Sequence, residues 1–168
     1  LKKDPYGDWE KKNYQSGVTP DCENVVPQFD HSIDNYLRIN VGSNTDVVVK
    51  LMKKDVIEEE CIRIVYVRSG EIYDIKNIPE GKYYLKIAYG RDLRQKIVDD
   101  QCIVKFIIHP IYEKGDKTLD FTKIKQPDTT VGGSRYENWS IPSFEISLDI
   151  QVIPGTKASF TSNSISEA

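Results

Sequence analysis

The chain has 168 residues, of which 39% are hydrophobic and 29% are charged, and its formal net charge at pH 7 is -3. A chain of this length suits a single domain that buries about two-thirds of the surface exposed by its unfolded form, so folding requires neither a metal nor a disulfide. The nearly balanced charge produces no field able to hold a nucleic-acid backbone. No apolar run reaches the ~20 residues that a membrane span needs. We therefore expect a folded domain with no nucleic-acid partner and no membrane span.

The first 34 residues differ from the rest of the chain. They are rich in Pro and Gly and show no apolar period of 2 or 3.6. They also contain four aromatic residues, Tyr6, Trp9, Tyr14 and Phe29. Because full exposure of these rings to water is unfavourable, we predict that residues 1–34 form an irregular N-terminal arm docked on the domain. The first residue is Leu1 rather than Met, as expected of a mature or trimmed chain, and whether a signal peptide or lipid anchor precedes it is left open.

Residues 35–153 show the period-2 alternation of half-buried strands. The candidate strands span residues 36–41, 46–52, 61–68, 71–75, 82–89, 102–108, 118–121 and 144–152. The last is the clearest, because its apolar residues alternate without error with polar ones. Short strands separated by turn signals, with helices brief or absent, predict an all-β fold, namely an antiparallel two-sheet β-sandwich.

Two segments of the chain are expected to lie outside the strands. Residues 123–136 are polar and contain Gly132 and Gly133, so we predict a long loop that is functional or mobile. The absence of a following Lys-Ser or Lys-Thr pair argues against a phosphate-binding loop there. Residues 154–168 are rich in Ser and are predicted to form a flexible C-terminal tail.

The three cysteines, Cys22, Cys61 and Cys102, have no CxxC spacing, which argues against a zinc site or a thioredoxin-type motif. Two states stay open. All three can be buried thiols, or Cys22 can form a disulfide with Cys61 or with Cys102. A disulfide would favour an oxidising compartment, whereas three free thiols would favour the cytosol.

The residues that usually carry catalysis or bind metals are sparse. His31 lies near Asp30 and Asp34, a set that can share a divalent ion, but a polar link before the first strand is the favoured interpretation. His109 precedes Pro110 and suits a turn. Adjacent acids, as in residues 58–60 and 99–100, point in different directions and form no acid/base pair by themselves. We predict no catalytic residue, no metal site and no cofactor, and therefore no enzyme.

Three aromatic residues are candidates for binding. Tyr84 lies between Lys82 and Lys86 on the polar face of its strand, and Tyr136 and Trp139 flank the predicted long loop. Exposed aromatic rings suit stacking on sugars or hot spots in protein interfaces. The alternative is that they cover the sandwich or the docked arm.

Residues 69–87 show a pattern that resembles a known family of β-sandwich modules. Residues 69–87 form a strand, the turn Asn77-Ile78-Pro79-Glu80-Gly81 and a second strand that contains Tyr83. This pattern resembles the transthyretin-like or Cna-B-like modules, which include carboxypeptidase regulatory-like domains. Pro79 fixes φ, Gly81 can take a turn conformation closed to other residues, and Tyr83 is expected to pack under the corner. The Lys-Asn-acid set of the self-formed isopeptide bond in some such modules is not found, although Lys50 is a conceivable lysine.

The resemblance implies a non-catalytic module of the kind found in secreted or cell-surface bacterial proteins. We expect an extracytoplasmic β-sandwich, secreted, periplasmic or on the cell surface, that mediates protein or glycan contact or acts as a structural spacer. A protein partner is favoured over a glycan. The alternative is an intracellular inhibitor or immunity-type binding protein that blocks its partner with the long loop or the arm. The ligand and the oligomeric state are left open.

Overall fold

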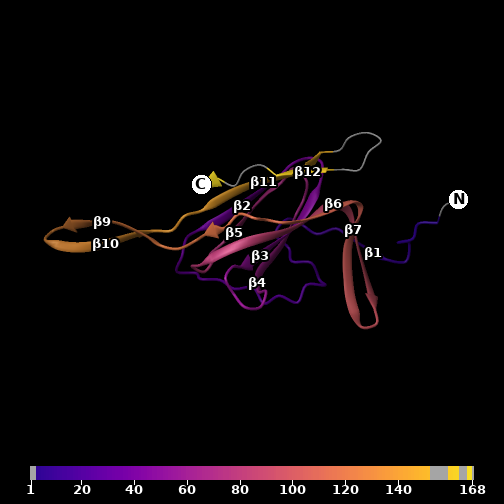
Figure 1. Ribbon diagram of the computed structural model, residues 1–168, viewed down its shortest axis with the longest axis horizontal. Coiled ribbons are helices and arrows are strands. Elements are labelled where there is room, and N and C mark those ends of the chain that lie inside the picture. The colour runs from indigo at the N-terminus through magenta and orange to yellow at the C-terminus, as the bar shows by residue number, and fades with distance from the viewer. Residues whose placement is uncertain (1–2, 152–158, 163–165, 168) are drawn as a thin grey trace.

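The computed structural model describes residues 3–151, 159–162 and 166–167 (Figure 1). Every regular element in these residues is a β-strand, which confirms the all-β prediction. Most of the predicted flexible tail, residues 154–168, lies outside the described residues. Its two described pieces, at 159–162 and 166–167, are short strands that pair with the last strand of the domain.

Thirteen strands are described. They are β1 (Glu10–Lys12), β2 (Tyr36–Val41), β3 (Asp46–Lys53), β4 (Cys61–Val67), β5 (Ile72–Lys76), β6 (Lys82–Val98), β7 (Gln101–Lys114), β8 (Leu119–Asp120), β9 (Ile124–Val131), β10 (Ser134–Ser140), β11 (Phe144–Gln151), β12 (Ser159–Ser162) and β13 (Ser166–Glu167).

Two of the three sheets form the body of the domain. The first has the order β1-β6-β3-β4, with β7 and β8 also paired to β6. The second has the order β12-β11-β2-β5, with β13 also paired to β11. One pair departs from the predicted antiparallel arrangement, because β2 and β11 run parallel, with Leu37 opposite Phe144. These strands come from opposite ends of the domain, so no tight turn has to join them.

The main core lies between the two sheets and is built by the predicted alternation. Leu37 and Ile39 of β2, and Ile146 and Leu148 of β11, are buried in one cluster with three residues of β3, namely Val47, Val49 and Leu51. Tyr83, Tyr89 and Phe121 of the same cluster are the largest fully buried side chains in the described residues. Full burial of each large apolar side chain contributes about 1.5–3 kcal/mol, so this layer supplies the main apolar stabilisation of the sandwich.

The predicted corner before β6 has the expected geometry. Gly81 has a φ of 153°, and the preceding Asn77 has a φ of 55°. Tyr83 packs under the turn and donates from its hydroxyl to the carbonyl oxygen of Pro79 at 2.7 Å. The buried Asn35 side chain donates to the Ile78 carbonyl at 2.9 Å and accepts from the Ile78 amide at 2.7 Å. The corner is therefore held by hydrogen bonds that would be costly to leave unmade.

Strands β6 and β7 are longer than predicted and extend beyond the body as a hairpin (Figure 1). Their register shifts near Gly90, where a Cβ would lie 2.3 Å from the Cβ of Phe106, so only glycine permits this close packing. Asp99 and Asp100, with φ of 50° and 62°, form the turn of the hairpin. The prediction ended the first of these strands too early, because charged residues such as Arg91 and Asp92 interrupt the apolar alternation on which it was based.

A second hairpin replaces the long loop predicted over residues 123–136. Strands β9 and β10 form a sheet of their own that projects away from the body (Figure 1). Gly132 and Gly133, with φ of 59° and 83°, form the two-residue turn that requires positive φ at both positions. The loop prediction was wrong because both strands carry polar residues on both faces, so no continuous apolar face marks them in the sequence. The signal that identifies the hairpin is the Gly-Gly pair between short β-prone segments.

The N-terminal arm follows two edges of the first sheet. Its strand β1 pairs with β6, with Glu10 opposite Gln95. Farther along, the Gly17 amide donates to the Tyr66 carbonyl at 2.7 Å, and the Tyr66 amide donates to the Val18 carbonyl at 2.8 Å. These bonds occupy the outer edge of β4, which would otherwise offer unpaired backbone groups to another strand.

The arm also covers part of the outer face of the first sheet. A second apolar cluster there contains Ile64, Tyr66 and Phe106, and Tyr14 and Val25 of the arm pack against it. The Tyr14 and Tyr66 rings are 5.8 Å apart between centroids. The arm residues therefore contribute apolar contacts as well as backbone hydrogen bonds to the body.

Candidate functional site

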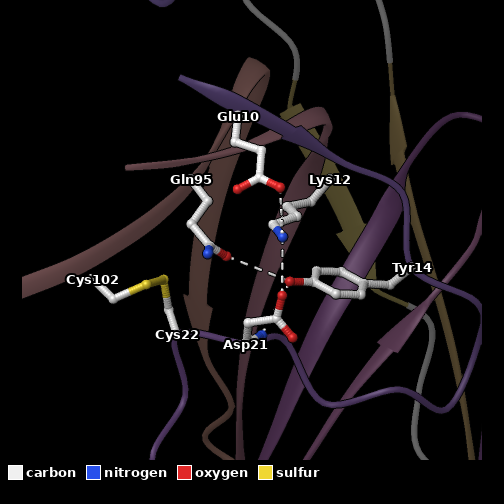
Figure 2. The surroundings of a disulfide bond; sticks show 7 residues. All are labelled: Glu10, Lys12, Tyr14, Asp21, Cys22, Gln95 and Cys102. Atoms are coloured by element: carbon white, nitrogen blue, oxygen red, sulfur yellow. Dashed lines mark hydrogen bonds and ion pairs between the residues drawn. A yellow bond between two sulfur atoms is a disulfide. The ribbon is translucent and has the colours of Figure 1, made fainter. Parts of the chain in front are cut away.

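A disulfide joins Cys22 of the arm to Cys102 of β7, with a Cα–Cα distance of 5.2 Å (Figure 2). This is one of the two pairings that the sequence left open. Cys61, the other candidate partner, is a half-buried free thiol whose pKa is raised by burial. The disulfide ties the arm to the projecting β6–β7 hairpin.

A group of polar contacts lies to one side of this disulfide (Figure 2). The Lys12 ammonium lies 3.0 Å from a carboxylate oxygen of Asp21 and 3.0 Å from one of Glu10. Its pKa is raised, first by the bond to Asp21 and then by the bond to Glu10. The Tyr14 hydroxyl donates to Gln95 Oε1 at 3.4 Å and accepts from the Asp21 amide at 3.0 Å. Because exposed ion pairs contribute little to stability, the disulfide and the apolar contacts are the stronger attachments of the arm.

Two of the predicted binding residues lie on the projecting β9–β10 hairpin. Tyr136 is 52% exposed and Trp139 is 54% exposed. They face Thr129 and Lys125, respectively, on β9. Because they are three positions apart on one strand, alternation directs their side chains to opposite faces of the hairpin. The two rings therefore do not form one flat platform.

Local contacts hold the hairpin in shape. The Asp128 carboxylate accepts from Lys125 at 2.7 Å and from Arg135 Nε at 2.7 Å, and the hydrogen bond to Lys125 is the largest of the causes that lower the pKa of Asp128. Asn138 donates from its side-chain Nδ2 to the Pro127 carbonyl oxygen at 2.8 Å, next to a register shift between the strands. A bulge is one of the few places where a strand tolerates proline.

Tyr84, the third predicted binding residue, lies on β6 in the body and not on the hairpin. Its hydroxyl donates to Glu59 Oε1 at 3.1 Å, and the Lys114 ammonium lies 5.2 Å from its ring centroid. Burial raises its pKa, and the bond to Glu59 raises it further. The structure therefore brings Tyr136 and Trp139 onto one element and places Tyr84 in a separate, half-buried polar network.

The two histidines and two of the buried tyrosines in the described residues have local structural contacts. His31 stacks on Phe29 with centroids 5.3 Å apart, and His109 lies at the β7 bulge with a φ of 47°. Burial raises the pKa of Tyr66 and raises that of Tyr83 to about 12, so both phenols stay protonated at neutral pH and act as donors. Within the described part of the chain, no group of three His, Cys, Asp or Glu residues is placed to hold a metal ion.

Comparisons with known proteins found no matching family model, no matching curated protein and no matching solved structure. The resemblance to transthyretin-like and Cna-B-like modules therefore stays a prediction. In the described ranges there is no helix of the length and apolar character needed to cross a membrane.

Proposed function

We propose that this chain is a non-enzymatic extracytoplasmic module that contacts a protein partner through the β9–β10 hairpin. The observation that carries the proposal is the exposure of large apolar side chains on an element that projects from the body. The exposed side chains are those of Ile124, Val131, Tyr136 and Trp139. Neither core cluster of the described residues includes a side chain of this hairpin. Its apolar surface therefore adds nothing to the core of the domain.

The energetics of an isolated hairpin favour this role. A two-stranded hairpin without a sheet or helix behind it is marginally stable in water. The ion pairs of Asp128 offset part of that cost, but they leave the apolar side chains exposed. A partner that encloses Trp139 or Tyr136 would bury large apolar surface, and aromatic residues of this kind dominate the energy of protein interfaces.

The arrangement of these side chains favours a protein over a glycan. Sugar rings stack on flat aromatic platforms, whereas Tyr136 and Trp139 point to opposite faces. The accompanying aliphatic residues, Ile124 and Val131, suit an apolar pocket of a protein. A hairpin inserted between two surfaces of a partner would bury both of its faces.

The disulfide supports the proposed compartment. Cys22 and Cys102 are joined, and such bonds persist in oxidising environments and are rare in the cytosol. This favours an extracytoplasmic location over the intracellular inhibitor that is the alternative.

The proposal is tested by site-specific photo-crosslinking in the cells that produce the protein. A photoreactive phenylalanine analogue replaces Trp139 in one variant and Tyr136 in another. The matched control carries the same analogue in place of Ile72, which is 57% exposed but lies on β5 of the body. Light-dependent adducts are then separated by mass.

The chemistry of the adduct distinguishes the kinds of partner. An adduct formed at the hairpin positions, absent at position 72 and removed by protease digestion of the partner, is expected. An adduct that resists protease and is removed by periodate oxidation would overturn the protein partner in favour of a glycan. An adduct of twice the mass of the chain would identify the partner as a second copy.

A further inference from the structure

Three lysines stand side by side on the outer face of the first sheet. Lys50 of β3 is directly opposite Lys86 of β6, and Lys86 is directly opposite Lys114 of β7. Side chains paired in this way have Cβ atoms about 4.5–5.5 Å apart, and like charges in such positions destabilise a sheet. The lysine row, as we call these three residues, therefore needs compensating negative charge.

The protein supplies only part of that charge. Glu23 of the arm lies 3.5 Å from the Lys50 ammonium, and Glu59 lies 2.7 Å from that of Lys86. Lys114 instead has its ammonium over the ring of Tyr84, at 5.2 Å from the centroid. Among the ion pairs of the described residues, two carboxylates thus contact the three lysines, and the end of the row at Lys114 is exposed.

The lysine row borders a cleft with an apolar floor. The cleft has a volume of about 450 Å³ and is lined on its apolar side by Val48, Ala88, Leu93, Val104 and Phe106. Pro20 and Glu23 of the arm form part of its wall, on either side of the disulfide-bonded Cys22. Clefts of roughly 300–1,000 Å³ that combine an apolar lining with a few polar groups are typical sites for small ligands.

The charges of the lining favour an anion. Lys50, Lys86, Lys105 and Lys114 contribute four positive charges, and Glu23 and Glu113 contribute two negative charges, a balance of +2. One of these carboxylates, that of Glu113, accepts a hydrogen bond from the Tyr89 hydroxyl at 2.6 Å. Lys105 lies 4.9 Å from the ring centroids of both Tyr6 and Trp9. The lysine row is therefore the part of the lining best placed to meet an incoming anion.

We propose that this cleft binds a small amphiphilic anion, with an apolar chain or ring on the floor and an acidic head group at the lysine row. The head group, a carboxylate, sulfonate or phosphate, would accept charge-assisted hydrogen bonds from Lys86 and Lys114. The apolar body would bury the floor formed by Val104 and Ala88. Both parts are required, because a hydrated inorganic ion leaves the floor exposed and a neutral apolar molecule leaves the lysine row uncompensated. This site is separate from the hairpin of the proposed function.

The experiment uses the fluorescent sulfonate anilinonaphthalene sulfonate (ANS) as the probe, titrated into the folded, oxidised full chain. Laurate, dodecanol, dodecylamine and inorganic phosphate are tested as competitors at monomeric concentrations. Lys86→Gln and Lys114→Gln remove charges from the row. Lys82→Gln is the matched control, because Lys82 lies on the same face of β6 but outside the cleft lining. Ala88→Phe fills the floor at a half-buried position.

We expect saturable ANS binding that is displaced by laurate and not by dodecanol, dodecylamine or phosphate. Each row variant should weaken ANS binding about three- to tenfold, as for loss of one hydrogen bond of ordinary strength at a solvent-exposed position, while Lys82→Gln leaves it unchanged. Ala88→Phe should abolish saturable binding while circular dichroism shows an unchanged fold. ANS bound at the β9–β10 hairpin would remain bound in Ala88→Phe, so this variant distinguishes hairpin binding from binding in the cleft.

Three results would overturn the proposal. The first is an equal affinity for ANS in the lysine-row variants and in Lys82→Gln. The second is equal displacement of ANS by dodecylamine and by laurate. The third concerns the source of the anion. Cosedimentation with vesicles of an anionic phospholipid, lost in Lys86→Gln, would assign the lysine row to a membrane surface and not to a free amphiphile.

Discussion

Cys22 and Cys102 are 80 positions apart in the chain, and their Cα atoms lie 5.2 Å apart, where the arm crosses the projecting part of β7. The carboxylates of Glu10 and Asp21 that pair with the nearby Lys12 are exposed to solvent, so these ion pairs add little and the disulfide is the stronger link between the arm and β7. It also holds the segment with Pro20 and Glu23 in place as a wall of the cleft.

Loss of this disulfide should destabilise the protein. The double variant Cys22→Ala and Cys102→Ala is expected to lower the free energy of unfolding by about 2–4 kcal/mol, because the unfolded chain regains the freedom of a long closed loop. Urea denaturation measures the change. Cys61→Ala, which removes the half-buried free thiol, is the control and should lower the free energy of unfolding by a smaller amount. An equal loss in both variants would contradict a structural role for the disulfide.

Removal of the β9–β10 hairpin should leave the sandwich folded. Replacement of residues 124–140 with a short Gly-Ser linker is expected to change the free energy of unfolding by less than about 1 kcal/mol, because the hairpin adds no side chain to the described core clusters. Thermal unfolding followed by circular dichroism is the measurement. Loss of cooperative unfolding would show that the hairpin is part of the domain core.

Gly90→Ala should be one of the more damaging small substitutions. Its Cβ would lie 2.3 Å from the Cβ of Phe106, so β6 or β7 must move, at a cost of about 1–3 kcal/mol. Gly7→Ala is the matched control, because its nearest neighbour, the Asp4 carbonyl oxygen, is 3.3 Å away at an exposed turn. Chemical denaturation of the two variants should separate them clearly. Equal stability would mean that the bend at Gly90 accommodates a methyl group.

The Asp92–Arg94 pair should make stability depend on acid pH. Arg94 donates from Nε at 2.6 Å and from Nη2 at 2.8 Å, and these bonds lower the pKa of Asp92. Because the pKa is lower in the folded state, the contribution is present above the ordinary Asp pKa of about 4 and is lost as pH falls through the lowered value.

Asp92→Asn is the variant that isolates this charge. Asp92 has a φ of 58°, a conformation that Asn also tolerates, so backbone strain should change little. The variant should be less stable by about 1 kcal/mol at neutral pH, and the difference should shrink below about pH 4. Denaturation of both proteins across the pH range provides the comparison. A difference that stays constant with pH would assign the loss to packing.

Alternation of apolar and polar residues was sufficient to predict most strands of the sandwich. In β2 and β11 it identifies the side chains that the structure buries, such as Ile39 and Leu148. The same principle failed where one face is not apolar. Strands β9 and β10 carry polar residues on both faces, so only the turn at Gly132 and Gly133 reveals them.

The features of the candidate sites depend on strand register, which alternation does not determine. Lys50, Lys86 and Lys114 each belong to a polar face, but their alignment follows from the pairing of β3, β6 and β7. Likewise, the sequence alone allows Cys22 to pair with Cys61 or with Cys102, because the pairing depends on the path of the arm. The exposure of Tyr136 and Trp139 was suggested by their position beside a polar segment, whereas Tyr84 is half-buried by contacts with Glu59 and Lys114 that lie far away in the chain.

The crosslinking yield at position 139, relative to that at position 72, tests the proposed function most directly. The account predicts a protease-sensitive adduct at position 139 and a yield several-fold above that of the control on β5. Equal yields at the two positions, in protein whose fold is intact, would contradict a role for the hairpin as the partner-binding element.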